Sequence, residues 1–247
     1  MPPACVESII RRMKTVVVLP TYNEAENLPG MVAELLALDL EDLRIVVVDD
    51  NSPDGTGEAA DRLAGCYPDR IHVIHREGKL GLGSAYAAGF AMALELGADY
   101  IVQMDADFSH SPFYIPQLLE ALSDHDVVIG SRYVEHGAVD ERWNIWRRLL
   151  SWGGNIYAQL ITGLHIHDVT GGFKAFRRRA LESIDWSRIR CDGYSFQIEV
   201  NYICQRKGFR MTEVPILFED RVIGRSKMSG RIVMEALWRV WQMRWRH

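Results

Sequence analysis

Two carboxylates stand one residue apart in the stretch 102–113, VQMDADFSHSPF, directly after a strand-like apolar run. Asp105 and Asp107 repel each other at this spacing, so a fold tolerates both only where water, hydrogen-bond donors or a cation compensates their charge. Hard cations such as Mg2+ and Mn2+ take carboxylate oxygens and complete their coordination with substrate phosphates. The pair therefore indicates either a solvated turn, where Asp is common, or a metal site for a diphosphate substrate.

Strand-like and helix-like segments alternate over the first half of the chain. The strand-like runs are short, rich in β-branched residues and mostly apolar at consecutive positions, as expected of strands buried on both faces. They span 15–20, 44–50, 71–76, 100–107 and 126–132. The segments between them, which have apolar residues at helical spacing, span 24–38, 55–65, 81–96 and 113–123. The alternation predicts βαβ units and an α/β fold with a largely parallel sheet.

Polar residues follow four of these predicted strands at their carboxyl ends, where ligands of such sheets bind. The four segments are PTYNE, DDNSPDGT, DADFSHSP and GSRY. Asp49 ends the second strand and is expected to meet a base or ribose, whereas Asp54, Gly55 and Thr56 are expected to shape the turn that follows. The sequence has no G-x-G-x-x-G after the first strand and no Walker lysine motif, so neither a dinucleotide nor a P-loop fingerprint is indicated.

The composition limits the cellular setting. The net charge of −5 over 247 residues argues against a general attraction to nucleic acid. The four cysteines are scattered without a C-x-x-C pair, which predicts a reducing, cytoplasmic location. We find no signal peptide and no apolar run of about 18 residues or more, so a soluble or peripheral protein is expected.

The C-terminal segment 221–247 is basic, with seven Lys or Arg against one Glu. In its last part, apolar residues recur at helical spacing at Met234, Leu237, Trp238, Trp241 and Trp245. Polar and charged residues share the opposite face at Arg231, Glu235, Arg239, Gln242 and Arg246. A basic, Trp-rich amphipathic helix predicts an anchor at a membrane interface. The alternatives are a helix packed on the core and a helix that docks a membrane subunit.

A second metal site is a weaker hypothesis for the segment LHIHD. His165 and His167 would point the same way only in an extended segment, and no further ligand cluster lies near them in the sequence. We therefore expect no metal there.

The ordered set of motifs resembles the family 2 glycosyltransferases, specifically the dolichyl or polyprenyl phosphate mannose synthases. The resemblance covers about residues 15–230 and rests on PTYNE, DDNSPDGT, GLGSAY, DADFSHSP, GSRY, TGGF, GYSFQIE and DRVIGRSK. It implies a Rossmann-like GT-A fold with a mixed, mainly parallel sheet flanked by helices. It also implies a metal-dependent inverting enzyme that moves mannose from GDP-mannose onto a dolichyl or polyprenyl phosphate, with Mg2+ or Mn2+ as cofactor, at the cytoplasmic face of a membrane. The predicted division is a catalytic domain, 1–230, and an amphipathic interfacial helix, 231–247.

The same resemblance assigns the donor and the metal to individual residues. Guanosine is assigned to five positions: Pro20, Tyr22, Glu24, Val47 and Asp49. Asp105, Ala106 and Asp107 would meet the ribose, the diphosphate and the metal, with Asp107 as the direct metal ligand. Ser109 stands where some relatives have a Gln ligand, so either its hydroxyl or a water would complete the metal site.

Basic residues are assigned to the phosphates. Arg221 and Lys227 would close over the donor diphosphate, and Arg221 joins Asp105 and Asp107 as a predicted catalytic residue. Arg132 would meet a phosphate of donor or acceptor, with Arg147 or Arg148 as a further candidate.

Two alternatives stay open at this point. Within the class, the chain could be a polyprenyl-phosphate glucosyltransferase that uses UDP-glucose, or another family 2 glycosyltransferase. Outside the class, it could bind nucleotide sugars without turnover. The intact DAD together with Arg221 and Lys227 favours an enzyme, and the missing Q-x-x-R-W signature disfavours a processive polymerase.

Overall fold

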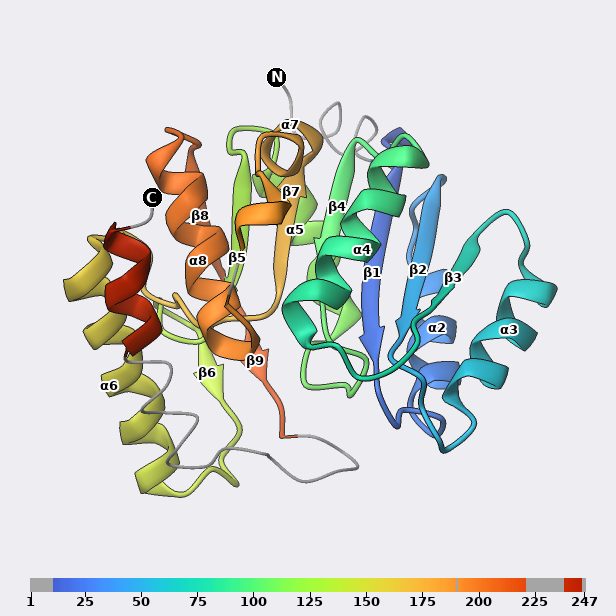
Figure 1. Cartoon of the computed structure of the whole chain (residues 1–247), viewed down its shortest axis with the longest axis horizontal. Coiled ribbons are helices and arrows are strands. Elements are labelled where there is room, and N and C mark those ends of the chain that lie inside the picture. The colour runs from blue at the N-terminus through green and yellow to red at the C-terminus, as the bar shows by residue number, and fades with distance from the viewer. Residues whose placement is uncertain (1–10, 190, 221–237, 246–247) are drawn as a thin grey trace.

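A seven-stranded sheet runs through the middle of the molecule with helices on both faces (Figure 1). The computed structural model describes residues 11–189, 191–220 and 238–245. Its strands are β1 (Thr15–Thr21), β2 (Leu43–Asp49), β3 (Ile71–His75), β4 (Tyr100–Gln103), β5 (Val127–Ser131), β6 (Ala138–Val139), β7 (Lys174–Arg177), β8 (Met211–Pro215) and β9 (Leu217–Phe218). Its named helices are α2 (Leu28–Leu36), α3 (Thr56–Cys66), α4 (Leu82–Glu95), η1 (Pro112–Tyr114), α5 (Ile115–Ala121), α6 (Ile145–Thr162), α7 (Arg178–Glu182), η2 (Trp186–Arg188) and α8 (Gly193–Arg206).

The strand order is β3-β2-β1-β4-β7-β5-β8, and β7 alone in this sheet runs antiparallel to its neighbours. The predicted mainly parallel sheet is confirmed, and the carboxyl ends of β1, β2, β4 and β5 lie at one edge of it. The sequence analysis did not identify β7 as a strand. This segment pairs with β4 and β5, and so brings the chain after residue 133 into the centre of the sheet.

The core has two layers because successive side chains of a strand point to opposite faces. On one face Val16 and Val18 of β1 pack with residues of α4, α7 and α8. On the other face Val17 and Leu19 pack with residues of α2 and α5. The near-continuous apolar runs in the sequence thus correspond to strands covered on both sides.

Helix α4 lies against β1 with very little space between them. A side chain added at Gly89 would place its Cβ 2.3 Å from Cγ1 of Val18, so only glycine allows this approach. The close contact fixes the height of α4 over the sheet, and with it the position of Tyr86 one turn earlier.

Helical residues 238–245 pack beside α6 (Figure 1). Val240 and Met243 are buried in the core, and Arg244 Nη1 donates to the carbonyl of Ile161 at 2.7 Å. Trp238 and Trp245 are 66% and 84% exposed. This part of the chain therefore packs on the core through one side while its tryptophans face outward. In the described part of the chain, every helix is too short or too polar to cross a bilayer.

Candidate functional site

Strand β4 ends at Gln103, earlier than the predicted strand end at 107. Residues 104–111, which follow it and carry Asp105 and Asp107, form the acidic loop. Asp107 lies in the loop, where its Oδ1 accepts hydrogen bonds from the Ser109 amide at 3.1 Å and the Ser109 hydroxyl at 2.5 Å. Phe108 between them has a φ of 60°. This left-handed residue turns the chain back so that Ser109 can reach Asp107. Ser109 is buried, and its hydroxyl fixes the orientation of the carboxylate.

Asp105, the first acid of the loop, is held by a helix that packs on the sheet. The Tyr86 hydroxyl of α4 donates to Oδ1 of Asp105 at 2.9 Å. Burial, reinforced by Asp105, raises the pKa of the Tyr86 phenol well above its usual value, so it carries its proton at neutral pH. The amide of Asp105 donates to Nδ1 of His110 at 3.2 Å, and the His110 ring stacks on Phe173. Burial lowers the pKa of His110, which favours the neutral ring that can accept this bond.

A glycine packs close to this acid. A Cβ added at Gly172, of the TGGF motif, would lie 3.3 Å from Cε1 of His110 and 3.7 Å from Oδ2 of Asp105. The site therefore combines two carboxylates and neutral hydrogen-bond donors, with the backbone of Gly172 close beside them. Carboxylate oxygens in this setting fit a hard divalent cation. Within the described ranges no three His, Cys, Asp or Glu residues are grouped to hold a metal, so such a cation would also need water or substrate oxygens.

Arg132 of GSRY lies in a buried ion pair with Asp168. Its Nε and Nη2 donate to the two Asp168 oxygens at 2.7 Å and 2.6 Å, and Nη2 also donates to Thr170. Burial alone would raise the pKa of Asp168, but Arg132 holds that pKa below its usual range. Burial of Arg132 lowers its pKa, but the charge of Asp168 outweighs this effect and raises the pKa of Arg132. Nη1 of Arg132 has no hydrogen-bond partner among the described residues.

A chain of aromatic contacts links Arg132 to the start of α6. The guanidinium carbon of Arg132 lies 5.3 Å from the Phe218 ring centroid, and Phe218 packs edge-on against both His110 and Trp143. Arg147 lies 3.8 Å above the Trp143 ring and pairs with Asp220. The structure therefore brings Arg132 and Arg147 to the same aromatic cluster, one contact away from the acidic loop.

Arg148, the other basic candidate, has a different role. Its Nε donates to the carbonyl of Trp143, and its Nη2 donates to the carbonyls of Asp140 and Glu141. These bonds tie the segment before α6 to the helix.

The residues predicted to hold guanosine fall into two groups. Tyr22 and Glu24 follow β1 at the sheet edge, where Lys79 Nζ lies 3.9 Å above the Tyr22 ring. Glu24 accepts a bond from Asn27 Nδ2 at 2.7 Å. Pro20 lies within β1 near its end and is half-buried. The first group thus lies where a nucleotide could reach it.

The other group is buried. The Val47 side chain lies in the core. Asp49 is also buried, and its two carboxylate oxygens accept bonds from Thr21 and from the Ser52 hydroxyl and amide. Ala106 is buried between the two acids of the loop. The bonds from Thr21 and Ser52 give Asp49 a structural role in the turn after β2. Its predicted contact with guanosine stays a prediction.

Asp54 and Thr56 stabilise the turns at this edge, as expected. Thr56 Oγ1 donates to Asp54 at 2.6 Å and accepts from the Glu24 amide at 2.9 Å, and Gly55 has a φ of 90°. The loops after β1 and β2 are thereby joined.

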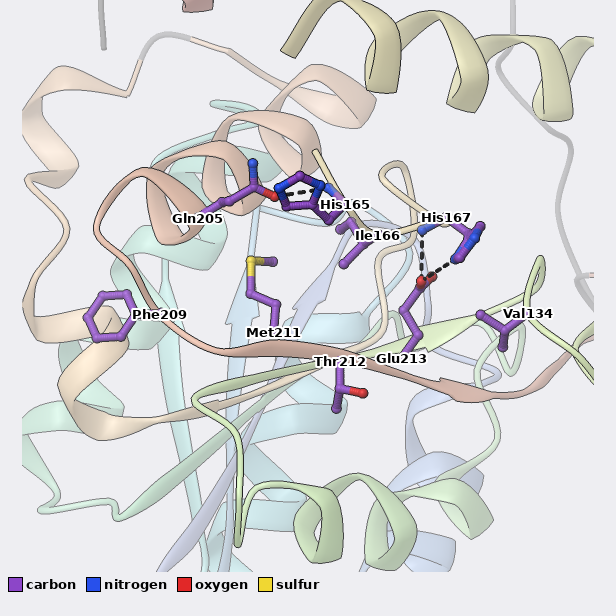
Figure 2. Close-up of a pocket in the computed structure, with 9 residues that line it drawn as sticks. All are labelled: Val134, His165, Ile166, His167, Gln205, Phe209, Met211, Thr212 and Glu213. Atoms are coloured by element: carbon purple, nitrogen blue, oxygen red, sulfur yellow. Dashed lines mark hydrogen bonds and ion pairs between the residues drawn. The ribbon is translucent and has the colours of Figure 1, made fainter. Parts of the chain in front are cut away.

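The two histidines of LHIHD lie beside the edge strand β8, away from the acidic loop. Figure 2 shows them at a pocket of about 390 Å³, with His167 directed at Glu213. One Glu213 oxygen accepts from the His167 ring and amide, and the other accepts from the Asp168 amide. Glu213 therefore helps to place Asp168 for its bond to Arg132.

Two predicted residues, Arg221 and Lys227, lie outside the described residues, as do the domain boundary at 230 and residues 231–237. Their assignments stay predictions.

Several residues of the site were missed by the sequence analysis. Tyr86, His110 and Asp168 are the main ones, and Asp50 is another: it pairs with Arg76 at 2.7 Å at the end of β2. For Asp50 and Asp168, the only signal in the sequence was that each is a carboxylate residue. Tyr86 has the spacing of an ordinary core residue on a helix, and although it ends the GLGSAY motif, the resemblance assigned no role to it.

Comparison with known proteins identifies a family for this chain. The family model described as Glycosyl transferase family 2 matches residues 16–185. A polyprenol monophosphomannose synthase from Mycolicibacterium smegmatis is 48% identical over 94% of this chain and 88% of its own length. An undecaprenyl-phosphate mannosyltransferase from Micrococcus luteus is 45% identical over 91% of either protein.

Solved structures show the same fold at low identity. A mannosyltransferase from Pyrobaculum calidifontis in complex with GDP-Man and Mn2+ has a TM-score of 0.66 and 20% identity, over 96% of this chain and 65% of that one. A glucosyl-3-phosphoglycerate synthase from Mycobacterium tuberculosis in complex with Mn2+ and UDP-Glc has a TM-score of 0.66 and 19% identity, over 95% of this chain and 79% of that one. The predicted GT-A fold is confirmed.

The buried ion pair predicts a large effect of Asp168→Asn on stability. The substitution leaves the Arg132 charge buried without its partner, which lowers the free energy of unfolding by about 3–5 kcal/mol. Urea denaturation measures the change. The matched control is Asp61→Asn, which removes the exposed pair with His75 and should change stability by less than about 0.5 kcal/mol. Equal effects of the two substitutions would contradict the role given to Asp168.

The same pair predicts a pH dependence. The folded pKa of Asp168 lies below its unfolded value of about 3.9, so the stabilisation is complete above about pH 4 and is lost as the pH falls through the folded pKa. The unfolding free energies of the wild type and of Asp168→Asn should therefore converge in acid.

Proposed function

The chain belongs to glycosyl transferase family 2, and from this membership we propose that it transfers mannose from GDP-mannose to a polyprenyl or dolichyl phosphate with inversion at the anomeric carbon. The observation that carries the proposal is the identity of 48% and 45%, over nearly the whole chain, to two relatives named for this transfer. The acidic loop and the nearby arginines provide a site with the chemistry that such a transfer needs.

In the reaction, a phosphate oxygen of the acceptor forms a bond to C1 of mannose while the bond from C1 to an oxygen of the GDP β-phosphate breaks, and GDP leaves with that oxygen and the electron pair of the bond. A phosphate monoester is already ionised at neutral pH, so the acceptor needs no general base. The acceptor and the leaving diphosphate are both anionic, so the protein must offset their repulsion and the charge that develops on the leaving group. Positioned cations and hydrogen-bond donors do this most effectively where water is excluded.

Two groups of described residues could neutralise these charges: the acids with a bound cation, and the arginines. Asp105 and Asp107, with Ser109 as the predicted further ligand, would hold a divalent cation. Mg2+ or Mn2+ there would neutralise charge on the diphosphate. On the other side, Nη1 of Arg132 and the guanidinium of Arg147 are the described groups that could meet the acceptor phosphate. Arg221 and Lys227 remain candidates for the donor diphosphate.

A donor assay tests the proposal. Radiolabelled GDP-mannose and UDP-glucose are offered separately, with a short polyprenyl phosphate and Mn2+ or Mg2+, and label in the lipid phase is counted. We expect transfer from GDP-mannose. Transfer from UDP-glucose alone would establish the glucosyltransferase alternative, and binding of donor without turnover would establish a nucleotide-sugar-binding protein.

Removal of the second acid should abolish most activity. We expect Asp107→Ala to retain under about 1% of wild-type turnover, because the loss of one such electrostatic contact costs about 3 kcal/mol in the transition state, or two powers of ten in rate. Asp124→Ala, which removes an exposed carboxylate, is the control. Near-normal turnover of Asp107→Ala with added Mn2+ would refute the metal assignment.

We also propose that the protein works at the cytoplasmic face of a membrane, since its acceptor is a lipid. Support comes from an apolar surface on two neighbouring helices. Helix α6 exposes large side chains along its length: Ile145, Trp146, Leu149, Leu150, Trp152 and Leu160. The neighbouring helical residues 238–245 also expose large side chains, Trp238, Trp241 and Trp245, and the basic Arg244 is exposed on the same helix. Exposed aromatic and basic groups in this combination favour an anionic lipid interface.

Vesicle binding tests this surface. The triple change of Trp238, Trp241 and Trp245 to Ser should weaken partition onto anionic vesicles at least about tenfold, and wild-type binding should weaken with salt. Tyr67→Ser is the control, because Tyr67 is exposed at the end of α3, at the opposite end of the molecule from α6 (Figure 1). Equal partition of all three proteins would contradict the proposal and would leave a membrane subunit as the alternative anchor.

A further inference from the structure

The phenol of Tyr86 joins a rigid helix to the acidic loop. Its ring is fully buried and stacks on Phe90 and Phe196, with centroids 5.7 Å and 5.9 Å away. The helix that carries it is fixed against β1 by the close approach at Gly89. The ring therefore has little freedom to move, and the hydroxyl presents its hydrogen at a defined point, 2.9 Å from Oδ1 of Asp105.

This hydrogen bond fixes how the two oxygens of Asp105 are placed. Oδ1 is engaged by Tyr86, whereas Oδ2 lies toward Gly172, 3.7 Å from where a Cβ at that residue would lie. The side chain is also anchored at its base, because the Asp105 amide donates to His110. With the amide and Oδ1 both held, the remaining carboxylate oxygen has one direction.

Without the phenol, the carboxylate would be free to choose another orientation. Repulsion from Asp107 favours orientations that move the two charges apart, and the χ2 torsion of an Asp, which sets the direction of its carboxylate, is broad. A cationic partner could also hold Asp105, but it would neutralise the charge that a divalent ion needs. A phenol holds the carboxylate and leaves its charge intact.

We propose that Tyr86 is a positioning residue that sets the orientation of Asp105 for a divalent ion and a nucleoside diphosphate. This assignment rests on the proposed function, since that function places the ion and the diphosphate at the acidic loop. Hydrogen-bond partners that orient metal ligands typically contribute 10–100-fold to metal affinity.

The first test measures binding without turnover. Free Mn2+ is followed by its electron paramagnetic resonance signal in the presence of GDP, for the wild type, Tyr86→Phe and Tyr100→Phe. We expect Tyr86→Phe to bind Mn2+ with GDP about tenfold more weakly. Tyr100→Phe is the matched control, because Tyr100 is a buried tyrosine at the far end of β4, and it should bind like the wild type. Circular dichroism establishes that the variants are folded, since the ring and its stacking are retained.

The second test separates positioning from general packing. The Asp105→Ala variant lacks the carboxylate to which Tyr86 donates its hydrogen bond. Adding Tyr86→Phe to that variant should therefore weaken Mn2+ binding no further. Equal losses from Tyr86→Phe in both backgrounds, or no loss in either, would overturn the assignment.

The outcomes also distinguish this inference from the proposed function. Normal wild-type binding of Mn2+ with GDP and no effect of Tyr86→Phe would contradict the role of Tyr86 alone. A wild type that does not bind Mn2+ with GDP would contradict the proposed donor, and the role of Tyr86 with it. If the binding cycle behaves as expected but mannose is not transferred, the role of Tyr86 stands and the proposed transfer fails.

Discussion

Mutual repulsion between Asp105 and Asp107 is the constraint on which the site depends. The fold does not separate the two carboxylates. Neutral groups donate to both of them: the Tyr86 phenol to one, and the Ser109 amide and hydroxyl to the other. These donors orient the carboxylates without cancelling their charge, so the loop stays attractive to a cation. The acidic loop is thus a half-site, which a divalent ion and a sugar diphosphate would complete.

The antiparallel strand β7 gives this half-site its surroundings. It enters the sheet between β4 and β5, which places Gly172 beside Asp105. Below that point, the buried Lys174 donates to the carbonyl and Oε1 of Gln197, and Gln103 at the end of β4 donates to the same Oε1. Burial lowers the pKa of Lys174 to about 7. The network ties β4, β7 and α8 together next to the acidic loop. The Arg132–Asp168 pair links the end of β5 to the segment that precedes β7.

Local features of the sequence predicted the parts of this structure that local chemistry determines. Consecutive apolar residues identified β1, β2, β3 and β5 to within one or two residues, and the polar residues after them identified the functional edge. The resemblance to family 2 glycosyltransferases is confirmed by the family match. Contacts between distant residues could not be predicted in this way. Asp168 is 36 positions from Arg132, and the sequence KAFR of β7 has too few apolar residues for a central strand until its neighbours are known.

The most direct test of the half-site is the affinity for GDP with and without a divalent ion. Calorimetric titration of the wild-type protein with GDP, in Mn2+ and again in excess EDTA, measures how far the cation and the diphosphate depend on each other. Because the acids repel a diphosphate unless a cation lies between them, we expect binding at least about tenfold tighter with Mn2+, a difference of about 1.4 kcal/mol. Equal affinity in Mn2+ and in EDTA would contradict the account.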